Sequence, residues 1–399
     1  MTNYKMEPLS NNVEEMFIGP FGSSLKNDCF VDKSEGYCMV YEQKHAIQKT
    51  MDLETRYVDE KKFNELKRFN IKGGDIIVSC RGTIGETYVV PDDAPLGIMH
   101  PSIMKIRLKE GVYDKCYFDL LLKSRLKKHE SEANGSGVKM AISATTLGKE
   151  LFPVPSMAEQ NEISKIISSV SDIIEKRTEE QNKLDALIKA RFVEMFGDPI
   201  ENPRNLAQAT LDELSELITK GASPSWQGFS YTDDSSQTLF VTSENVREGY
   251  IDLSSPKYIE DGFNDKQKRS VLKKGDFLIN IVGASIGRAA QFNLDCKANM
   301  NQAAALVRIA DQRIRDNYLT IYLNSEKAQQ MYDSMKSDTG RANLSLQDIA
   351  NLKILLPPVE EQIEFERFVN QVDKSKVVVQ QALDETQMLF DSLMQEYFG

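Results

Sequence analysis

The sequence predicts an α+β protein: two tandem α/β modules separated by two long helices that form an antiparallel coiled coil, with a pseudo-twofold internal repeat. Its 399 residues are too many for one ordinary core and suit two domains. The second half repeats the first, and each half ends in the apolar periodicity of a long helix. We expect the first module over 1–155, the first helix over 156–197, the second module over 198–357 and the second helix over 358–399.

The internal repeat is the strongest signal in the sequence. Residues of the first half recur in the second half, in the same order, at an offset of 201 or 202. The pairs include Leu9 and Leu211, Gly19 and Gly221, Tyr57 and Tyr258, Gly74-Asp75 and Gly275-Asp276, Met99 and Met300, Arg107 and Arg308, Tyr117 and Tyr318, Glu159-Gln160 and Glu361-Gln362, and Phe196-Gly197 and Phe398-Gly399. So many matches at one offset are not chance, and they indicate one module written twice.

Each copy has the same internal order of elements. Short apolar runs after a turn, such as Asp75-Ile-Ile-Val-Ser and Asp276-Phe-Leu-Ile-Asn, predict strands. Shorter helical stretches are expected at 115–129 and 316–336. A proline segment follows each of them and is expected to stop the preceding strand: Phe152-Pro-Val-Pro155 and Leu356-Pro-Pro358.

Both long helices carry apolar residues at helical spacing. The first has a stripe that polar residues interrupt in the middle: Ile163, Ile166, Ile167, Val170, Ile173, Ile174, Leu184, Leu187 and Ile188. The second stripe is close to a seven-residue repeat: Phe365, Phe368, Val372, Val379, Ala382, Leu389 and Leu393. Because neither helix could bury a one-sided stripe alone, we expect the two to pack together. The alternative is that each helix only completes the core of its own domain.

The composition excludes several classes of protein. No apolar run approaches the ~18 to 20 residues that a membrane span needs, so we expect no membrane association. The polar start of the chain has no signal-peptide pattern, which predicts a cytoplasmic protein. The five cysteines are scattered and include no C-x-x-C pair, which predicts reduced thiols and no metal site.

The usual catalytic and nucleotide-binding motifs are missing. The sequence contains no P-loop, no H-E-x-x-H and no G-x-S-x-G, and none of its three histidines recurs in the second copy. The repeat keeps glycines, aromatics and prolines, which are structural residues. The sequence therefore predicts a chain that binds rather than catalyses.

The net charge of −11 is unevenly distributed. Residues 158–196 hold eight acids against six bases, and residues 359–398 hold nine acids against three bases. The rest of the chain is nearly neutral and contains basic clusters, so the acidic total does not exclude nucleic acid as a ligand. Two similar modules also suit a ligand of repeating geometry, and DNA is the obvious case.

Several ordered and duplicated segments resemble the specificity subunits of type I restriction-modification systems, over essentially the whole chain. They are Gly19-Pro-Phe-Gly-Ser-Ser-Leu-Lys26, Lys220-Gly-Ala-Ser-Pro224, the "G-D-apolar" strands with their glycine loops (74–85 and 275–287), Pro153-Val-Pro155 with Glu159-Gln160, Phe196-Gly-Asp-Pro199, and Leu344 to Pro358 running into Glu360-Glu-Gln362. Each motif is weak by itself, but their order and duplication are specific.

The resemblance implies a fold and a set of partners. Such proteins have two target-recognition domains that each read one half of an asymmetric, bipartite double-stranded DNA site, and they do no chemistry themselves. The resemblance implies that the helices dock two adenine-N6 methyltransferase subunits, which bind S-adenosylmethionine. It also implies that nuclease-translocase (restriction) subunits, which use ATP and Mg²⁺, can join; this chain itself would hold no cofactor. The candidate docking residues are the polar positions within the helices: Arg177, Gln181, Ser375 and Lys376.

Affinity for DNA is expected from clustered bases near the mouth of each module. The candidates are Arg56, Lys61, Lys62, Lys67, Arg68 and Arg81 in the first module, and Lys266, Lys268, Arg269, Lys273, Lys274 and Arg288 in the second. For any single one of them, the alternative is a solvated side chain without a specific role.

Base reading is expected from polar loop residues that differ between the copies, since two half-sites differ. The candidates are Gln43, Lys44, His45, Arg81 and Lys139, then Trp226, Gln227, Ser243, Asn245, Arg341 and Asn343. For Trp226, the only tryptophan, two interpretations are open. Its side chain stacks on the DNA, or it packs into the core and anchors the loop there, which we favour.

Two other functions remain open from the sequence. A duplicated scaffold that binds only protein would bind its partners without DNA and without salt sensitivity, whereas DNA recognition predicts a steep loss of affinity with salt. An enzyme with an unfamiliar site would transfer methyl groups without partners.

Overall fold

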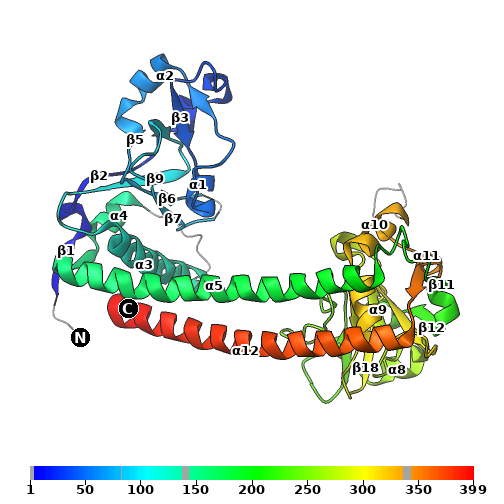
Figure 1. Ribbon diagram of the computed structural model, residues 1–399. Helices are drawn as coiled ribbons and strands as arrows, with labels where there is room; N and C mark the ends of the chain where they lie inside the picture. The colour runs from blue at the N-terminus through cyan, green and yellow to red at the C-terminus, as the bar shows by residue number, and fades with distance from the viewer. Residues whose placement is uncertain (1–3, 82, 137–142, 336–342) are drawn as a thin grey trace. The chain divides into compact units, whose positions relative to one another are not determined.

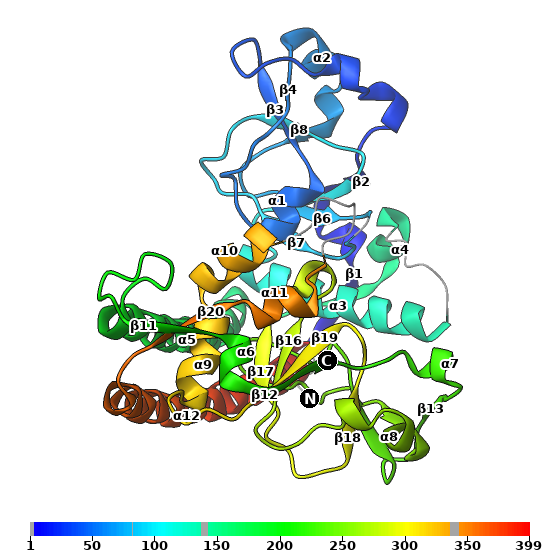
Figure 2. The same ribbon diagram turned by 90° about the vertical axis from the view of Figure 1, so that its right-hand side faces the viewer.

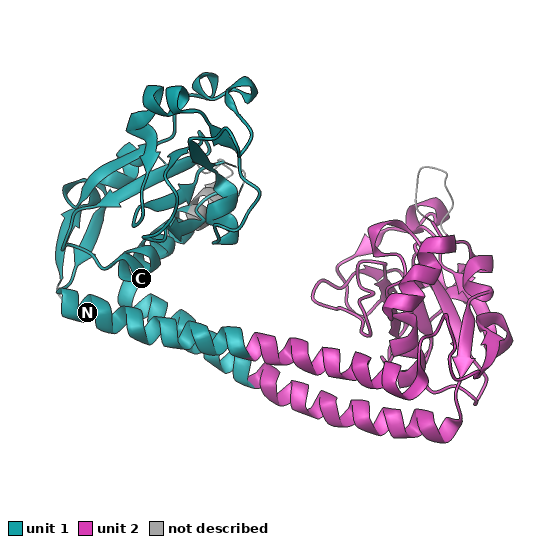
Figure 3. Cartoon of the chain, turned by 45° about the horizontal axis from the view of Figure 1, so that its top comes forward, with its two compact units in different colours: residues 1–176, 382–399 teal, residues 177–381 magenta. Residues whose placement is uncertain are grey.

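The computed structural model describes residues 4–81, 83–136, 143–335 and 343–399. The chain divides into two compact units, Met1–Lys176 with Ala382–Gly399, and Arg177–Gln381 (Figure 3). The division falls inside both 40-residue helices, α5 (Met157–Phe196) and α12 (Val359–Phe398) (Figure 1). Each unit therefore contains one module together with a segment of each long helix.

The first unit contains two four-stranded sheets and a two-stranded one. The first four-stranded sheet is antiparallel, in the order β2 (Val13–Ile18), β9 (Ile103–Leu108), β6 (Ile76–Ser79) and β7 (Thr87–Val89). The second has the order β4 (Tyr57–Val58), β3 (Cys38–Tyr41), β8 (Gly97–Met99) and β5 (Asn70–Ile71), with β3 and β8 parallel. The two-stranded sheet pairs β1 (Lys5–Pro8) with β10 (Leu151–Val154).

The second unit repeats the antiparallel and two-stranded sheets, whereas its mixed sheet has a different strand order. Its antiparallel sheet has the order β12 (Ser215–Lys220), β19 (Ala304–Ile309), β16 (Phe277–Asn280) and β17 (Ala289–Gln291), labelled in Figure 2. Its second four-stranded sheet has the order β13 (Tyr231–Thr232), β15 (Tyr258–Ile259), β14 (Thr238–Val241) and β18 (Ala298–Met300). A two-stranded sheet pairs β11 (Ala207–Thr210) with β20 (Lys353–Leu356). The predicted internal repeat is confirmed, because strand for strand the first sheet has the same order in both units.

Helices connect and cover these sheets. The first unit has α1 (Gln43–Gln48), α2 (Glu60–Glu65), α3 (Lys115–Ser136) and α4 (Ala144–Lys149). The second has α6 (Leu211–Leu214), α7 (Pro224–Gln227), α8 (Gly262–Lys266), α9 (Asp316–Leu323), α10 (Glu326–Met335) and α11 (Leu346–Ala350). Single turns of 3₁₀ helix lie at Leu9–Asn11, Gly22–Ser24, Asn27–Cys29, Lys67–Phe69, Lys268–Ser270 and Gly283–Ser285.

The structure corrects two expectations about these elements. The helix expected over 316–336 is interrupted at Asn324, whose amide side chain bonds both the N–H and the C=O of Ala289 on β17 (3.0 and 2.8 Å) and thereby fixes the turn. Pro153 does not stop a strand but lies inside β10, opposite Met6, and β10 ends at Val154, immediately before Pro155 of the same segment. A two-stranded sheet has free edges, where the missing N–H of proline is tolerated. In the second copy, β20 ends at Leu356, before the two prolines, as expected.

The repeated Gly-Asp and Arg residues form one buried ion pair in each module. Asp75, which is 1% exposed, accepts a bidentate pair from Arg107 on β9, with both N–O distances at 2.6 Å. Asp276 and Arg308 repeat this geometry at 2.7 Å. Each carboxylate also accepts the N–H of the residue three positions earlier, which closes the turn before the central strand. These repeated residues are therefore structural.

A fully buried glutamine joins each long helix to its module. The Gln160 side chain accepts from the N–H of Asp114 (2.8 Å) and donates to the carbonyls of Val112 and Pro155 (both 2.9 Å). In the second unit, Gln362 accepts from the N–H of Arg315 (2.9 Å) and donates to the carbonyls of Arg313 and Pro357 (2.9 and 2.8 Å). One side chain thus ties the first turn of the long helix to the start of α3 or α9.

The ends of the long helices complete the module cores. In the first unit, Ile163 and Ile167 of α5 join Phe398 of α12 in the core that contains Tyr117. In the second unit, Phe192 and Phe196 of α5 pack with Phe365 of α12 (5.7 and 5.3 Å between ring centroids). The first turns of one helix thus meet the last turns of the other in each unit, so the two helices run antiparallel.

Part of the predicted apolar stripe is not covered by this packing. Ile173, Leu187 and Leu389 are 42, 47 and 51% exposed, so the packing of the helices leaves these three stripe residues accessible. In the second unit, the Gln181 side chain donates to the Lys376 carbonyl and to Gln380 Oε1 (both 3.2 Å), and Lys376 pairs with Asp185 (2.6 Å). Polar bonds therefore hold the helices together between their apolar ends.

His45 caps the first turn of α1 as a neutral side chain. Its Nδ1 accepts the N–H of Glu42 (3.0 Å), the Glu42 side chain accepts in return from the His45 N–H, and the imidazole is fully buried. Burial lowers the pKa of His45, since the charged imidazolium would lose its water.

We predict that replacing Gln362 with Leu lowers the free energy of unfolding by about 2 to 4 kcal/mol, because buried backbone groups lose their partners. The exposed Gln347 on α11, which bonds only Asn351, provides the matched control. Replacing Gln347 with Leu should lower the free energy of unfolding by no more than ~0.5 kcal/mol. Urea unfolding, with hydrogen exchange over residues 313–323, measures both. Equal losses in the two variants would contradict the role of Gln362.

We predict that His45 makes stability depend on pH below about 6.5, the value of a histidine in an unfolded chain. Since the pKa of His45 is lower in the folded chain, its imidazole binds a proton in the unfolded chain at pH values where it stays neutral in the folded chain. Stability is therefore complete above pH ~6.5 and falls with pH, by at most about 1.4 kcal/mol per unit. His45→Gln, which keeps a capping side chain, should flatten urea midpoints measured between pH 5 and 7. An unchanged slope would rule out this explanation.

Candidate nucleic-acid interface

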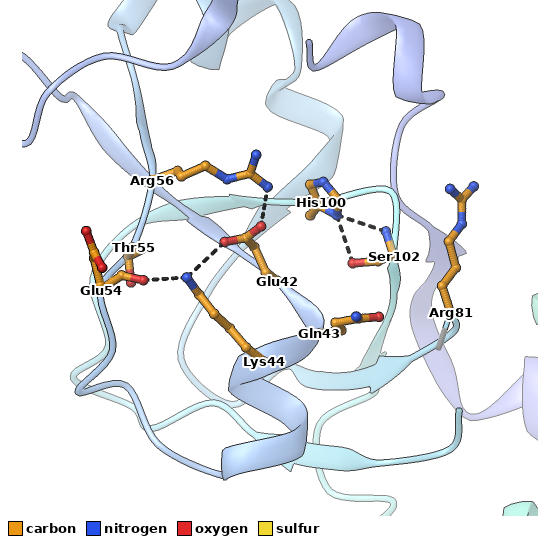
Figure 4. Close-up of a pocket in the computed structure, with 9 residues that line it drawn as sticks. All are labelled: Glu42, Gln43, Lys44, Glu54, Thr55, Arg56, Arg81, His100 and Ser102. Carbon is orange, nitrogen blue, oxygen red and sulfur yellow. Dashed lines mark hydrogen bonds and ion pairs between the residues drawn. The ribbon is translucent and has the colours of Figure 1, made fainter. Parts of the chain in front are cut away.

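A polar pocket lies beside α1 in the first module. We call it the α1 pocket; it has a volume of about 580 Å³ and is lined by Glu42, Gln43, Lys44, Glu54, Thr55, Arg56, Arg81, His100 and Ser102 (Figure 4). Four separate segments supply these residues: the start of α1, the chain before β4, and the loops after β6 and after β8. Four of the predicted DNA-binding residues meet here: Gln43, Lys44, Arg56 and Arg81.

The charges in the α1 pocket are partly balanced. Burial alone raises the pKa of Glu42, but Arg56 and Lys44 outweigh it and hold that pKa below its usual range. Arg56 is also stacked on Phe30, with 4.0 Å between its guanidinium carbon and the ring centroid. Arg81 is exposed, lies on the opposite side of the pocket from Arg56 in Figure 4, and has no ion-pair partner among the described residues. Arg81 is thus the most available cation of the pocket.

Two neutral side chains add hydrogen-bonding capacity to the α1 pocket. Within the part of the chain that the structure describes, Gln43 Oε1 is buried and has no hydrogen-bond partner. His100 shares a hydrogen bond with the Ser102 hydroxyl (2.8 Å), and burial lowers the pKa of this imidazole. An amide and an arginine in one pocket are the side chains that pair bidentately with adenine and guanine edges.

Two predicted base readers are instead buried and structural. His45 caps α1, as described above. Asn245 is 7% exposed; its Oδ1 accepts from the N–H and hydroxyl of Thr242 (2.8 and 3.0 Å), and its Nδ2 donates to the Asp252 carbonyl (2.9 Å). Because neither side chain has a free polar edge at the surface, we remove both from the interface.

The remaining first-module candidates lie outside the α1 pocket. Lys61 and Lys62 are on α2, where Lys62 pairs with Glu65 (2.6 Å). Lys67 and Arg68 are in the 3₁₀ turn after α2, and Arg68 lies over the Phe17 ring at 5.2 Å. Lys139 is outside the described residues, as is Arg341 of the second module.

The second-module candidates form two groups. Arg288 lines a pocket of about 520 Å³ together with Glu248, Gly283 to Ile286 and Gln329, and a β-bridge between Val282 and Asn343 brings Asn343 to the same loop. The other group is at α7 and α8, where Lys266 Nζ donates to the Gln227 carbonyl (2.8 Å) and Lys268 and Arg269 follow. Ser243 does not line either group, but its carbonyl accepts from the Asn280 side chain (2.9 Å), which also donates to Ser285 of the Arg288 pocket (3.2 Å). Lys273 and Lys274 form the turn before β16.

The favoured interpretation of Trp226 is wrong, because its side chain is 89% exposed. The core beneath α7 is filled by other residues: Pro224 is buried, and Phe229 packs edge-to-face on Phe263 (5.5 Å). Phe21, which was not among the residues predicted to bind DNA, is 87% exposed in the loop after β2. The repeat pairs this loop with that of Trp226, and that signal could have found it.

A third surface, which we call the helix groove, lies within the second unit. Its volume is about 1070 Å³, and residues of α5, α12, α9 and α10 line it, including Ile188, Phe192, Val193, Ile321 and Val369. Val193 and Tyr250, also in its wall, are 57 and 60% exposed. Of the predicted docking residues, Lys376 lines this groove. Gln181 bonds the other helix, the Ser375 hydroxyl donates to the Gln371 carbonyl (3.4 Å), and Arg177 lies mid-helix on α5.

The described residues contain no group of three or more His, Cys, Asp or Glu side chains placed to hold a metal ion. None of the helices that the structure describes is both long and apolar enough to span a membrane.

Comparison with known proteins identifies the family. The model of the type I restriction modification DNA specificity domain matches the chain twice, at residues 25–186 and 205–385. The specificity subunit of type I restriction enzyme EcoBI from Escherichia coli is 26% identical over 349 residues, or 81% of this chain and 73% of that protein. The MjaVIII specificity subunit from Methanocaldococcus jannaschii is 21% identical over 310 residues, or 74% and 71%.

Solved structures share the fold. One comes from work on complex assembly and conformational transition of the type I R-M system; it has a TM-score of 0.62 at 17% identity and covers 100% of this chain and 98% of that one. The type I S subunit from M. genitalium has a TM-score of 0.51 at 14% identity, with 100 and 97% covered. The duplicated module, its paired helices and the double family match lead to one conclusion: the chain belongs to the type I restriction-modification DNA specificity family, as a non-catalytic subunit that recognises DNA.

Proposed function

We propose that each module reads one half of an asymmetric, two-part site in double-stranded DNA. The observation that carries this proposal is that matched strands of the two modules, β6 and β16 in the repeated antiparallel sheet and β8 and β18 in the parallel pairs, are followed by different side chains. Arg81 and His100 of the α1 pocket correspond to Val282 and Asn301 in the second module, by the register of β6 with β16 and β8 with β18. One scaffold with two different sets of loop side chains suits two different half-sites.

The side chains of the loops suit two kinds of DNA contact, one with phosphates and one with base edges. Lys44 and Arg56 in the first module, and Lys266, Lys268 and Arg269 in the second, would contact phosphates and set affinity. Gln43 and Arg81 would read base edges in the first half-site, and Asn343 and Arg288 in the second. We place the protein in the cytoplasm, where it meets the DNA of the cell.

We predict that this chain, expressed with its methyltransferase partner, directs adenine methylation to a two-part motif. Replacing residues 1–155 with the same module of another specificity subunit should change one half of the motif and leave the other half unchanged. Single-molecule sequencing of the host genome reads both outcomes. Methylation that needs no contribution from this chain, combined with salt-insensitive binding of protein alone, would favour a protein scaffold instead.

We further propose that the paired helices carry two methyltransferase subunits, which bring S-adenosylmethionine, and that restriction subunits using ATP and Mg²⁺ can join. The helix groove supports this idea, because it combines exposed apolar side chains with a rim of charges that includes Asp185, Lys327 and Lys376. An apolar centre with a polar rim is the usual anatomy of a protein interface. The exposed stripe residues Ile173, Leu187 and Leu389 add to the apolar surface available to a partner.

We predict that Val193→Glu weakens methyltransferase binding about tenfold or more, because a desolvated charge in an apolar groove loses roughly 1.4 kcal/mol or more. Since Val193 is already 57% exposed, the fold should tolerate the change. Leu253→Glu is the control, as Leu253 is 37% exposed and lies outside the groove lining. Dissociation constants from biolayer interferometry with the purified partner compare the two. Equal weakening would argue against docking in this groove.

A further inference from the structure

The two most exposed large apolar side chains that the structure describes lie in matched loops of the two modules. Phe21 is 87% exposed and Trp226 is 89% exposed, whereas the next most exposed, Val377, reaches 67%. Phe21 is in the first aromatic loop (residues 19–25), which follows β2, and Trp226 is in the second (residues 221–228), which follows β12. A single exposed aromatic needs no explanation, but the same feature in the same loop of both copies does.

Both loops are held close to the same part of the module. A Cβ at Gly19 would collide with the backbone carbonyl of His100, and a Cβ at Gly221 with that of Met300. The Gly19 N–H also donates to the Ile103 carbonyl (3.0 Å). Each glycine thus lets the loop pass directly over the segment that leaves the second sheet. In the first module, that segment carries His100 and Ser102 of the α1 pocket.

Each loop is pinned on both sides of its aromatic residue. In the first, Pro20 and Leu25 are buried, and the Ser24 N–H donates to the Phe21 carbonyl (2.8 Å). In the second, Pro224 is buried and accepts the Phe229 N–H (3.1 Å), while Lys266 holds the Gln227 carbonyl (2.8 Å). The aromatic side chains therefore project from turns that hydrogen bonds and buried neighbours hold in place.

Cationic side chains lie near both aromatic loops. Gly19 of the first loop lies against the backbone of His100, which lines the α1 pocket together with Arg56, Arg81 and the acidic Glu42 and Glu54. The second loop is bonded to Lys266, which precedes Lys268 and Arg269. The loops also differ in sequence, Gly-Pro-Phe-Gly against Gly-Ala-Ser-Pro-Ser-Trp, yet each presents one aromatic ring. Rings beside lysines and arginines are the combination with which proteins stack on bases while holding phosphates.

We propose that Phe21 and Trp226 are stacking wedges, each inserted at a base step of the half-site that its module reads. The proposal rests on the DNA-reading function of the modules and adds to it a contact that is independent of phosphate charge. An inserted ring unstacks neighbouring bases and kinks the duplex, and it replaces the lost base stacking with its own. A methyltransferase partner needs its target base unstacked, so a wedge at each half-site would assist that step.

The test uses the complex of the full chain with its methyltransferase. The DNA is a duplex that contains the two-part motif methylated by this complex in the host genome. The duplex carries 2-aminopurine at successive positions of one half-site, and its fluorescence reports local unstacking. Trp226→Ala and Phe21→Ala should each weaken DNA binding about tenfold. Each should also abolish the 2-aminopurine signal in its own half-site only. The slope of affinity against salt should stay unchanged, since no phosphate contact is lost.

Two sets of variants make the result specific. Trp226→Phe and Phe21→Tyr keep a ring and should restore both affinity and signal. Tyr37→Ala removes another exposed aromatic, 48% exposed and packed on Phe63, and should change neither. The changed rings are exposed, so folding should be unaffected, which circular dichroism checks.

Three results would overturn the proposal. The first is an unchanged affinity for DNA together with an intact 2-aminopurine signal in the alanine variants. The second is a decrease of about one in the slope of log affinity against log salt concentration while the signal remains, which would indicate that the change displaced a cation from a phosphate. The third is loss of methyltransferase binding in place of DNA binding, which would assign the rings to a protein interface. A wild-type complex that binds no DNA would instead refute the DNA-reading function itself, and with it the wedge.

Discussion

The buried glutamine at the start of each long helix is the contact on which the arrangement of each unit depends. Gln160 and Gln362 are fully buried, and each satisfies one N–H and two carbonyls with a single amide. An amide buried with all three bonds made is stabilising, whereas any one bond left open would be costly. The module and the first turn of its helix are therefore fixed to each other as one body, and a recognition surface keeps its place relative to that helix.

The duplication separates residues that hold the module from residues that give it a target. The Asp75–Arg107 pair and its copy, Asp276–Arg308, agree to within 0.1 Å in their bond lengths. In contrast, the loop residues after the same strands differ, as with Arg81 and Val282. A buried ion pair tolerates little change because a lone buried charge is costly, while an exposed loop is free to change with the sequence it must read.

The long helices combine two tasks along their length. Their ends are apolar and enter the module cores, as Ile163 and Phe365 do. Their middle relies on polar bonds such as Gln181 to the Lys376 carbonyl, and it leaves apolar side chains such as Val377 exposed. The two interpretations of the helix stripes are thus both correct in part: the helices complete the cores at their ends and pair with each other between them.

Local patterns in the chain predicted the duplication, the strand that follows each Gly-Asp turn and the helix at Val359–Phe398, because turn residues and apolar period are local properties. The sequence also indicated a DNA specificity subunit. The tertiary fold was needed to see that His45 and Asn245 are buried, that Trp226 is exposed, and that Phe21 is exposed in the corresponding loop of the first module. Which side of a loop faces the core depends on what else fills that core, here Pro224 and Phe229, and no local pattern records that choice.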